Sequence, residues 1–146
     1  MKPRAAWPIL AKRAKEKCEE AQADVVKARE RVAHLEQSLQ RMEMLYLDYV
    51  HRAKEAEKKL HSMAETLNNR GFMQQVKALV IRVQADLVQA NQALNDKKML
   101  LLAAEKKRIQ METLMEQDLK QVRAFHQKRE QREMDAAGVM LFNLKT

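Results

Sequence analysis

The side chains that could act as nucleophiles, proton carriers or metal ligands are few and widely spaced. The chain has one cysteine, Cys18, and four histidines, His34, His51, His61 and His126. Zinc sites use histidines and cysteines at short, regular spacings, and these residues form no such pair or cluster. A Gly-rich loop that could cradle phosphates is missing too. The sequence therefore predicts that the protein is not an enzyme and has no cofactor or metal ion.

The cysteine count and the absence of long apolar runs indicate where in the cell the protein works. Cys18 is the single cysteine, so the chain has no internal disulfide, which is typical of the reducing cytoplasm. No apolar run approaches the roughly 18 residues of a membrane span. The N-terminus is basic but lacks the apolar stretch of a signal peptide. We therefore expect a cytoplasmic protein.

The first half of the chain carries an apolar stripe with the period of a coiled coil. A non-charged, mostly apolar residue returns every three or four positions, and an average of about 3.5 is the period of a left-handed supercoiled helix. This predicts one long helix that packs along another. The stripe consists of Trp7, Ala11, Ala14, Cys18, Ala21, Val25, Ala28, Val32, Leu35, Leu39, Met42, Tyr46, Tyr49, Ala53, Ala56, Leu60, Met63 and Leu67.

A second, less regular stripe follows a short break at residues 68–71, Asn-Asn-Arg-Gly, where Gly71 can adopt the left-handed conformation that ends a helix. We therefore expect an all-α fold: a long antiparallel two-helix coiled-coil hairpin, in a single domain spanning 1–146. Its helices should cover about 8–67 and 72–137, with a turn at 68–71 and an apolar tail at 138–146. The second stripe consists of Met73, Val76, Val80, Val83, Leu87, Ala90, Leu94, Lys97, Leu101, Ala104, Arg108, Met111, Met115, Asp118, Val122 and Phe125.

A turn at that place fixes which residues face each other. Tyr49 would lie opposite Ala90, a large side chain beside a small one. The charged members of the second stripe, Lys97, Arg108 and Asp118, interrupt an otherwise apolar seam. Polar residues at such positions usually specify the register of a coiled coil at some cost in stability.

The net charge of +8 is concentrated near the two ends of the sequence. Residues 1–17 carry a net charge of +5 and residues 120–132 a net charge of +4, whereas residues 18–119 are neutral overall. A hairpin would bring the two basic segments together, which predicts a basic tip that docks on an acidic surface. Cations near the C-terminus of the second helix could instead simply be stabilised by the helix dipole. The cations of the first helix lie near its N-terminus, where the dipole disfavours positive charge, so the dipole does not explain them.

Residues on both sides of the predicted turn carry a family resemblance. Met42-x-x-Leu45-x-x-x-Tyr49 precedes the turn, Phe72-x-x-x-Val76-x-x-Leu79-x-x-x-Val83 follows it, and a charged run, Lys-Arg-Glu-Gln-Arg-Glu-Met-Asp, occupies 128–135. These motifs resemble the FliJ family, the stalk proteins of the flagellar type III export ATPase. The resemblance spans essentially the whole chain. Leu45 stands where the family often has Tyr, and Val83 replaces a commonly polar residue.

The resemblance implies a shaft similar to that of rotary ATPases. Its terminal end would enter the ring of the hexameric flagellar export ATPase and promote assembly and activity. A surface near the turn would contact the cytoplasmic domain of the export-gate membrane protein, and export chaperones would be further partners. The protein would then be peripheral to the inner membrane at the flagellar base.

Two sets of residues are candidates for these contacts. The gate-binding patch carried over from the resemblance consists of Met42, Leu45, Tyr49, Phe72, Val76, Leu79 and Val83. The basic candidates for contact with the ATPase ring are Lys12, Arg13, Lys15, Lys17, Lys120, Arg123, Lys128, Arg129 and Arg132. Leu45, Phe72 and Leu79 lie beside the stripes and are better contact candidates than Tyr49 or Val76, which belong to the seam.

Three other functions stay open from the sequence. The first is the equivalent stalk protein of a virulence injectisome, which would share this architecture. The second is a structural coiled coil that pairs between two chains. The third is a nucleic-acid binder, but the base-stacking aromatic residues of such proteins are missing and the central segment is neutral, so no specific nucleic acid is expected.

Overall fold

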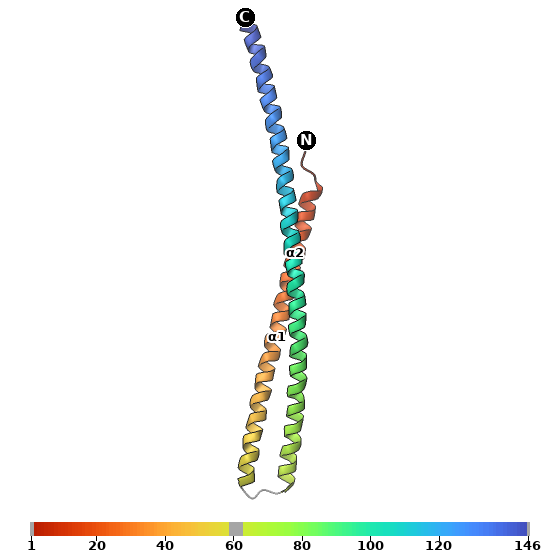
Figure 1. Ribbon diagram of the computed structural model, residues 1–146, viewed down its shortest axis with the longest axis vertical. Helices are drawn as coiled ribbons and strands as arrows, with labels where there is room; N and C mark the ends of the chain where they lie inside the picture. Colours follow the sequence, from red (N-terminus) through yellow and green to blue (C-terminus); the bar gives the residue numbers. More distant parts are fainter. Residues whose placement is uncertain (1, 59–62, 146) are drawn as a thin grey trace. The chain divides into compact units, whose positions relative to one another are not determined.

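The computed structural model describes residues 2–58 and 63–145, and it consists of two long helices (Figure 1). Helix α1 spans Ala6–Lys58 and helix α2 spans Met63–Lys145. The two helices pack against each other, which confirms the predicted all-α class and the helical hairpin. Within the described residues, neither helix contains a segment long and apolar enough to cross a membrane.

The apolar stripes are the packing faces of the two helices. Every stripe residue from Trp7 to Ala56 in α1, and from Met73 to Val122 in α2, is buried or half-buried. The predicted coiled-coil period is therefore confirmed over these segments. The most buried of the described side chains are Ala11, Ala14, Cys18, Val25, Val32, Val76, Ala90 and Val122.

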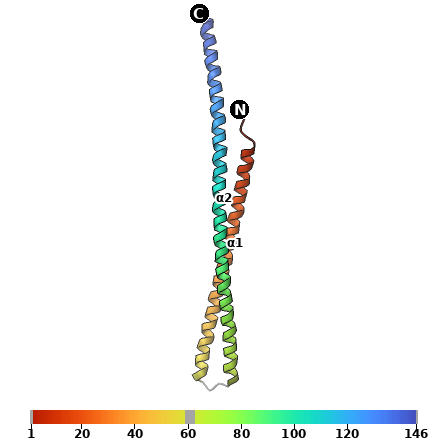
Figure 2. The same ribbon diagram turned by 45° about the vertical axis from the view of Figure 1, so that its right-hand side comes forward.

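The chain forms two compact units. The terminal unit comprises Met1–Glu20 and Leu101–Thr146, and the inner unit comprises Ala21–Leu100. In the terminal unit the Arg4 N–H donates a hydrogen bond to Asp118 Oδ2 at 2.9 Å, so the start of α1 lies beside a late part of α2. In the inner unit the end of α1 and the start of α2 lie side by side in both views (Figures 1 and 2). The helices are antiparallel within each unit.

The structure places the break between the helices earlier than the sequence predicts. Residues 68–71 lie inside α2, and no described glycine, Gly71 included, has a positive φ. The predicted turn at 68–71 is therefore wrong. Glycine is tolerated inside a helix at a cost of about 1 kcal/mol, and packing outweighs that cost here: the half-buried Asn69 lies beside Ala53 and Ala56 of α1.

The earlier break changes the facing residues. Tyr49 contacts Phe72, with ring centroids 4.7 Å apart, so the predicted pairing of Tyr49 with Ala90 is wrong. Met63 and Leu67, expected at the end of the first stripe, belong to α2 and are 82% and 61% exposed.

The predicted tail is helical. Helix α2 continues through Gly138 to Lys145, so the expected helix end at Gly138 is wrong. All described side chains after Val122 are exposed. Helix α1 begins only at Ala6, close to Arg4 and therefore to Asp118, so within the terminal unit the last turns of α2 extend past the start of α1.

Candidate functional site

The gate-patch candidates lie in the inner unit, and three of them are exposed. The side chains of Leu45, Phe72 and Leu79 are 43%, 44% and 48% exposed. Phe72 and Leu79 are seven residues apart and therefore project from the same side of α2. The Tyr49–Phe72 contact brings that side of α2 next to α1. As predicted, these three side chains lie beside the seam, and they are exposed.

The other gate-patch candidates mainly form the seam. Val76 is only 3% exposed, which makes it a core residue. Met42, Tyr49 and Val83 are half-buried. A partner that touches this face would reach the edges of these side chains, whereas Val76 supports the patch from beneath.

An arginine that the sequence analysis did not select completes this face. The Arg52 guanidinium carbon lies 5.8 Å from the centroid of the Tyr49 ring, within range of a cation–π contact. Arg52 Nη2 also lies 3.2 Å from Asp48 Oδ2, in an exposed ion pair. The sequence does indicate these contacts, because side chains three or four residues apart on one helix are neighbours, as Tyr49 and Asp48 are to Arg52. The patch is therefore apolar with one cation over its aromatic centre.

The ring-contact candidates lie in the terminal unit, where two of them join a basic groove. Arg13 and Lys17 of α1 share a groove of about 120 Å³ with Lys107 of α2. Its other lining residues, Leu10, Ala14 and Met111, are uncharged, so no carboxylate in the lining neutralises the three cations. Lys107 was not predicted because it lies in a segment that is neutral overall, although the run Lys-Lys-Arg at 106–108 is a local basic cluster.

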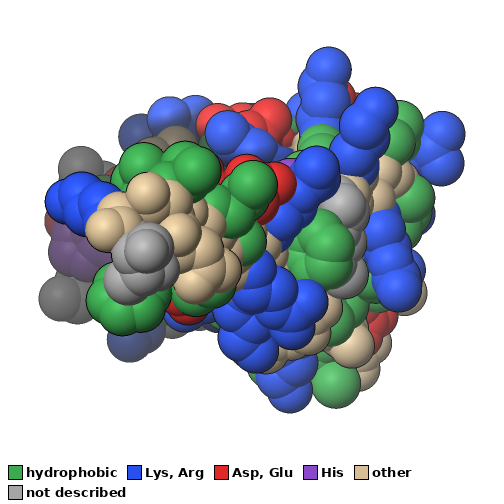
Figure 3. All heavy atoms as spheres, turned by 90° about the horizontal axis from the view of Figure 1, so that it is seen from above, with side chains coloured by type: hydrophobic (Ala, Val, Ile, Leu, Met, Phe, Trp, Pro, Cys, Tyr) green, Lys and Arg blue, Asp and Glu red, His purple; other side chains and the backbone are tan. Residues whose placement is uncertain are grey.

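The remaining basic candidates are exposed but dispersed. Lys12 and Lys15 are exposed on α1, and Lys120, Arg123, Lys128, Arg129 and Arg132 are exposed on α2. In Figure 3, which looks onto the end where the C-terminus of α2 lies, Lys and Arg side chains occupy much of the visible surface. Arg129 is partly neutralised, because its Nε lies 3.3 Å from Glu133 Oε1.

A charged residue in the terminal unit's seam has partners of its own. Arg108 is half-buried and its Nη1 lies 3.2 Å from both carboxylate oxygens of Glu112. The hydrogen bonds that Arg108 donates to Glu112, followed by that with Cys18, raise the pKa of Arg108 above its ordinary value. Cys18 itself is 3% exposed, which suits packing rather than nucleophilic chemistry.

The next feature is the arrangement of side chains that could bind a metal ion. Among them, no group of three or more His, Cys, Asp or Glu side chains is placed to hold a metal ion. Two surfaces built from the predicted residues are candidates for partner recognition: the apolar patch of the inner unit and the basic groove of the terminal unit.

The sequence was compared with known proteins. The model of one family, described as Flagellar FliJ protein, matches residues 9–146. No curated protein and no solved structure matches the chain. The matched segment contains both candidate surfaces and nearly all of α1 and α2. The chain therefore belongs to the FliJ family of flagellar proteins.

Proposed function

We propose that this protein is the non-enzymatic central stalk of the flagellar type III export ATPase. Membership of the FliJ family implies a structural, chaperone-type role in flagellar protein export. In the finer proposal, the terminal unit enters the hexameric ATPase ring and promotes its assembly and activity. The inner unit contacts the cytoplasmic domain of the export-gate membrane protein, and export chaperones are further partners. The protein works in the cytoplasm, peripheral to the inner membrane at the flagellar base.

The single observation that carries the ring proposal is the uncompensated basic groove. Arg13, Lys17 and Lys107 come from two helices and meet without a carboxylate in the lining. Like charges held together repel one another, so the cluster is stabilised by an acidic partner surface. Helix dipoles do not explain it, because Arg13 and Lys17 lie about two and three turns inside α1 and Lys107 lies in the interior of α2, beyond the reach of the helix ends.

The gate proposal rests on the inner unit's exposed apolar side chains. Leu45, Phe72 and Leu79 are exposed apolar side chains, and the aromatic pair Tyr49–Phe72 lies at the end of this surface nearest the break between the helices. Aromatic anchors beside aliphatic side chains are typical of the energetically important part of an interface.

A stalk made of two unlike helices can act on a ring without doing chemistry. Chemically identical ring subunits that surround the terminal unit meet different side chains of α1 and α2. Those unequal contacts favour unequal subunit states, which couples stalk binding to nucleotide turnover through differential binding free energy.

The ring proposal is tested by neutralising the groove. We expect Arg13→Gln/Lys17→Gln/Lys107→Gln to abolish most of the stimulation of the purified export ATPase, at several salt concentrations. The matched control is Lys27→Gln/Arg29→Gln/Arg31→Gln, which removes the same charge from exposed positions of α1 in the inner unit. Unchanged stimulation in the groove variant, or equal loss in both, would show that the groove is not the ring contact.

The gate proposal is tested separately. Leu45→Ala/Leu79→Ala should weaken binding to the purified cytoplasmic domain of the gate protein by at least about tenfold, because exposed apolar contacts are lost while the seam stays intact. Leu47→Ala/Ile81→Ala is the matched control, with side chains 64% and 58% exposed. Retained binding by the patch variant contradicts the gate proposal and leaves the ring proposal untouched.

A further inference from the structure

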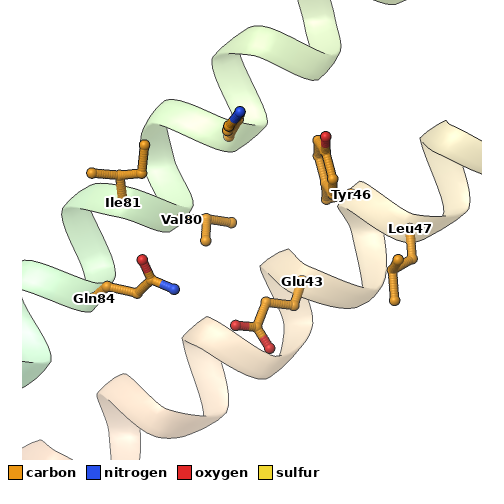
Figure 4. Close-up of a pocket in the computed structure, with 7 residues that line it drawn as sticks. Glu43, Tyr46, Leu47, Val80, Ile81 and Gln84 are labelled. Carbon is orange, nitrogen blue, oxygen red and sulfur yellow. The ribbon is translucent and has the colours of Figure 1, made fainter.

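The inner unit has a groove that no part of the proposed function uses. It measures about 410 Å³, and its floor is apolar, with Tyr46, Leu47, Val80 and Ile81 (Figure 4). Glu43, Gln84 and Lys77 complete the lining. A smaller hollow of about 250 Å³ shares Tyr46 and Lys77 and prolongs the groove towards Arg70. The two hollows together are lined by residues from Arg70 to Gln84 on α2, which is about four turns, and by Glu43, Tyr46 and Leu47 on α1, which is about one turn.

This groove lies on the face opposite the gate patch. On α1, Leu47 and Leu45 lie on the two sides of Tyr46, about 100° from it in opposite senses. On α2, Ile81 and Leu79 stand in the same relation to Val80. Tyr46 and Val80 belong to the seam, and both line the groove with Leu47 and Ile81. Leu45 and Leu79 line neither hollow. The inner unit can therefore be occupied on both faces at once.

The rim of the groove has a distinct charge pattern. Arg70 and Lys77 line it from α2 and are seven residues apart, which places their side chains on the same side about 10.5 Å apart along the axis. Among the described residues, neither takes part in an ion pair. The one carboxylate in the lining, Glu43, comes from α1 and accompanies Gln84 at the far end. The α2 rim therefore offers two unneutralised cations, two helical turns apart.

We propose that this groove binds an amphipathic helix of another protein that carries acidic side chains seven residues apart. The apolar face of that helix would cover Leu47 and Ile81, which are otherwise 64% and 58% exposed. Its acidic flank would pair with Arg70 and Lys77. Helix-in-groove recognition of this kind uses apolar anchors at i, i+3, i+4 and i+7, a spacing that the length of the groove accommodates.

The charge pattern favours this occupant over a second copy of the chain. The same face of a second copy would supply one lining carboxylate, Glu43, for two cations. Binding here requires neither the basic groove nor the gate patch, so its failure would leave the proposed ring and gate contacts standing.

The test uses the full chain and two fluorescently labelled helical peptides with the same apolar face, one with Glu at flank positions i and i+7 and one with Lys there. We expect the Glu peptide to bind with an affinity at least about tenfold above that of the Lys peptide, measured by anisotropy. Leu47→Asp/Ile81→Asp should remove this binding. Leu45→Asp/Leu79→Asp, matched in size and charge on the opposite face, should retain it. Circular dichroism checks folding, and Leu47→Ser/Ile81→Ser replaces the first variant where it unfolds.

A charge-reversal variant tests whether Arg70 and Lys77 set the preference for acidic side chains. Arg70→Glu/Lys77→Glu should exchange the preference, so that the Lys peptide binds better than the Glu peptide. A photo-cross-linker at position 81 in the native host should capture a peptide whose sequence has acids seven residues apart beside an apolar stripe. Equal affinity for both peptides, equal loss in the variant of the opposite face, or cross-links only to a second copy of this chain would overturn the inference.

Discussion

The ring of Tyr49 lies against the ring of Phe72, with centroids 4.7 Å apart and planes inclined by 44°. This pair joins α1 to α2 in the inner unit and fixes which seam residues face each other there. It also places an aromatic centre beneath the gate patch, flanked by Arg52. One contact thus determines both the local register and the shape of the proposed binding surface.

A double-mutant cycle measures that contact. Phe72→Ala should lower the free energy of unfolding by about 1–2 kcal/mol, because a half-exposed ring loses apolar contacts. The coupling free energy between Phe72→Ala and Tyr49→Ala should be about 0.5–1.5 kcal/mol, the usual value of an aromatic pair. The control cycle, Tyr49→Ala with Ala90→Ser, should show no coupling, and a sizeable coupling there would instead support the register that the sequence predicts.

Substitution of Gly71 distinguishes the two positions of the turn. In the structure Gly71 is helical, and a Cβ added to it would meet no atom within 4 Å. Gly71→Ala should therefore raise the free energy of unfolding by about 0.5–1 kcal/mol, through better helix propensity and a less flexible unfolded chain. Chemical denaturation checks this. Destabilisation would mean that Gly71 has the left-handed conformation of a turn.

The sequence predicted the seam but not its register, for a physical reason. Stripes with a spacing of three or four residues match about as well when one helix slides along the other by several of these steps, because seam residues then face seam residues again. The register therefore depends on particular contacts such as Tyr49–Phe72, and a periodicity cannot reveal these. The segment 68–71 was misleading because an Asn-Asn-Arg-Gly segment is compatible with either a turn or a helix interior when packing favours it.

The candidate surfaces were predictable to different degrees. Leu45, Phe72 and Leu79 were predicted to be better contact candidates than the seam residues because they lie beside the stripes, and in the structure their side chains are exposed. The grouping of Lys107 with Arg13 and Lys17 could not be predicted, because it depends on the register. Whether these surfaces bind the proposed partners stays a prediction.

Two neighbouring residues of α2 separate support of the gate patch from contact with a partner. Val76→Ala should lower the free energy of unfolding by about 1–2 kcal/mol, because Val76 is 3% exposed and its truncation leaves a cavity. Leu79→Ala should change stability by less than about 0.5 kcal/mol, because Leu79 is 48% exposed. Gate binding, measured with folded protein, should follow the reverse order. Equal effects of both substitutions on stability would assign Leu79 to the core.

Arg108 provides a test of polar residues in the seam. Arg108→Leu should raise the midpoint of thermal unfolding by a few degrees, because a half-buried cation is replaced by an apolar side chain at a packing position. Glu112, its partner, stays in contact with solvent and keeps its charge hydrated. Arg108→Lys, which retains the charge, is the control. A lower midpoint for Arg108→Leu would show that the contacts of Arg108 with Glu112 and Cys18 stabilise the terminal unit.

The hydrogen bond from the Arg4 N–H to Asp118 Oδ2, 2.9 Å long, attaches the start of the chain to α2 in the terminal unit. The Trp7 N–H donates in turn to the Arg4 carbonyl at 3.3 Å, so the bond to Asp118 supports the first turn of α1. Asp118→Ala should speed hydrogen–deuterium exchange at residues 4–10 by about two- to tenfold, since a net hydrogen bond of this kind is worth about that factor. Exchange in the inner unit should not change.

Asp118→Asn distinguishes whether Asp118 holds the start of α1 as a hydrogen-bond acceptor or through its negative charge. The side-chain carbonyl of asparagine can still accept the hydrogen bond from Arg4, so exchange at residues 4–10 should stay close to that of the unsubstituted chain. Faster exchange in both variants would indicate that the carboxylate acts through its charge near the N-terminal end of α1, where the helix dipole favours an anion. Unchanged exchange in Asp118→Ala would mean that the start of α1 is held by packing of its stripe alone.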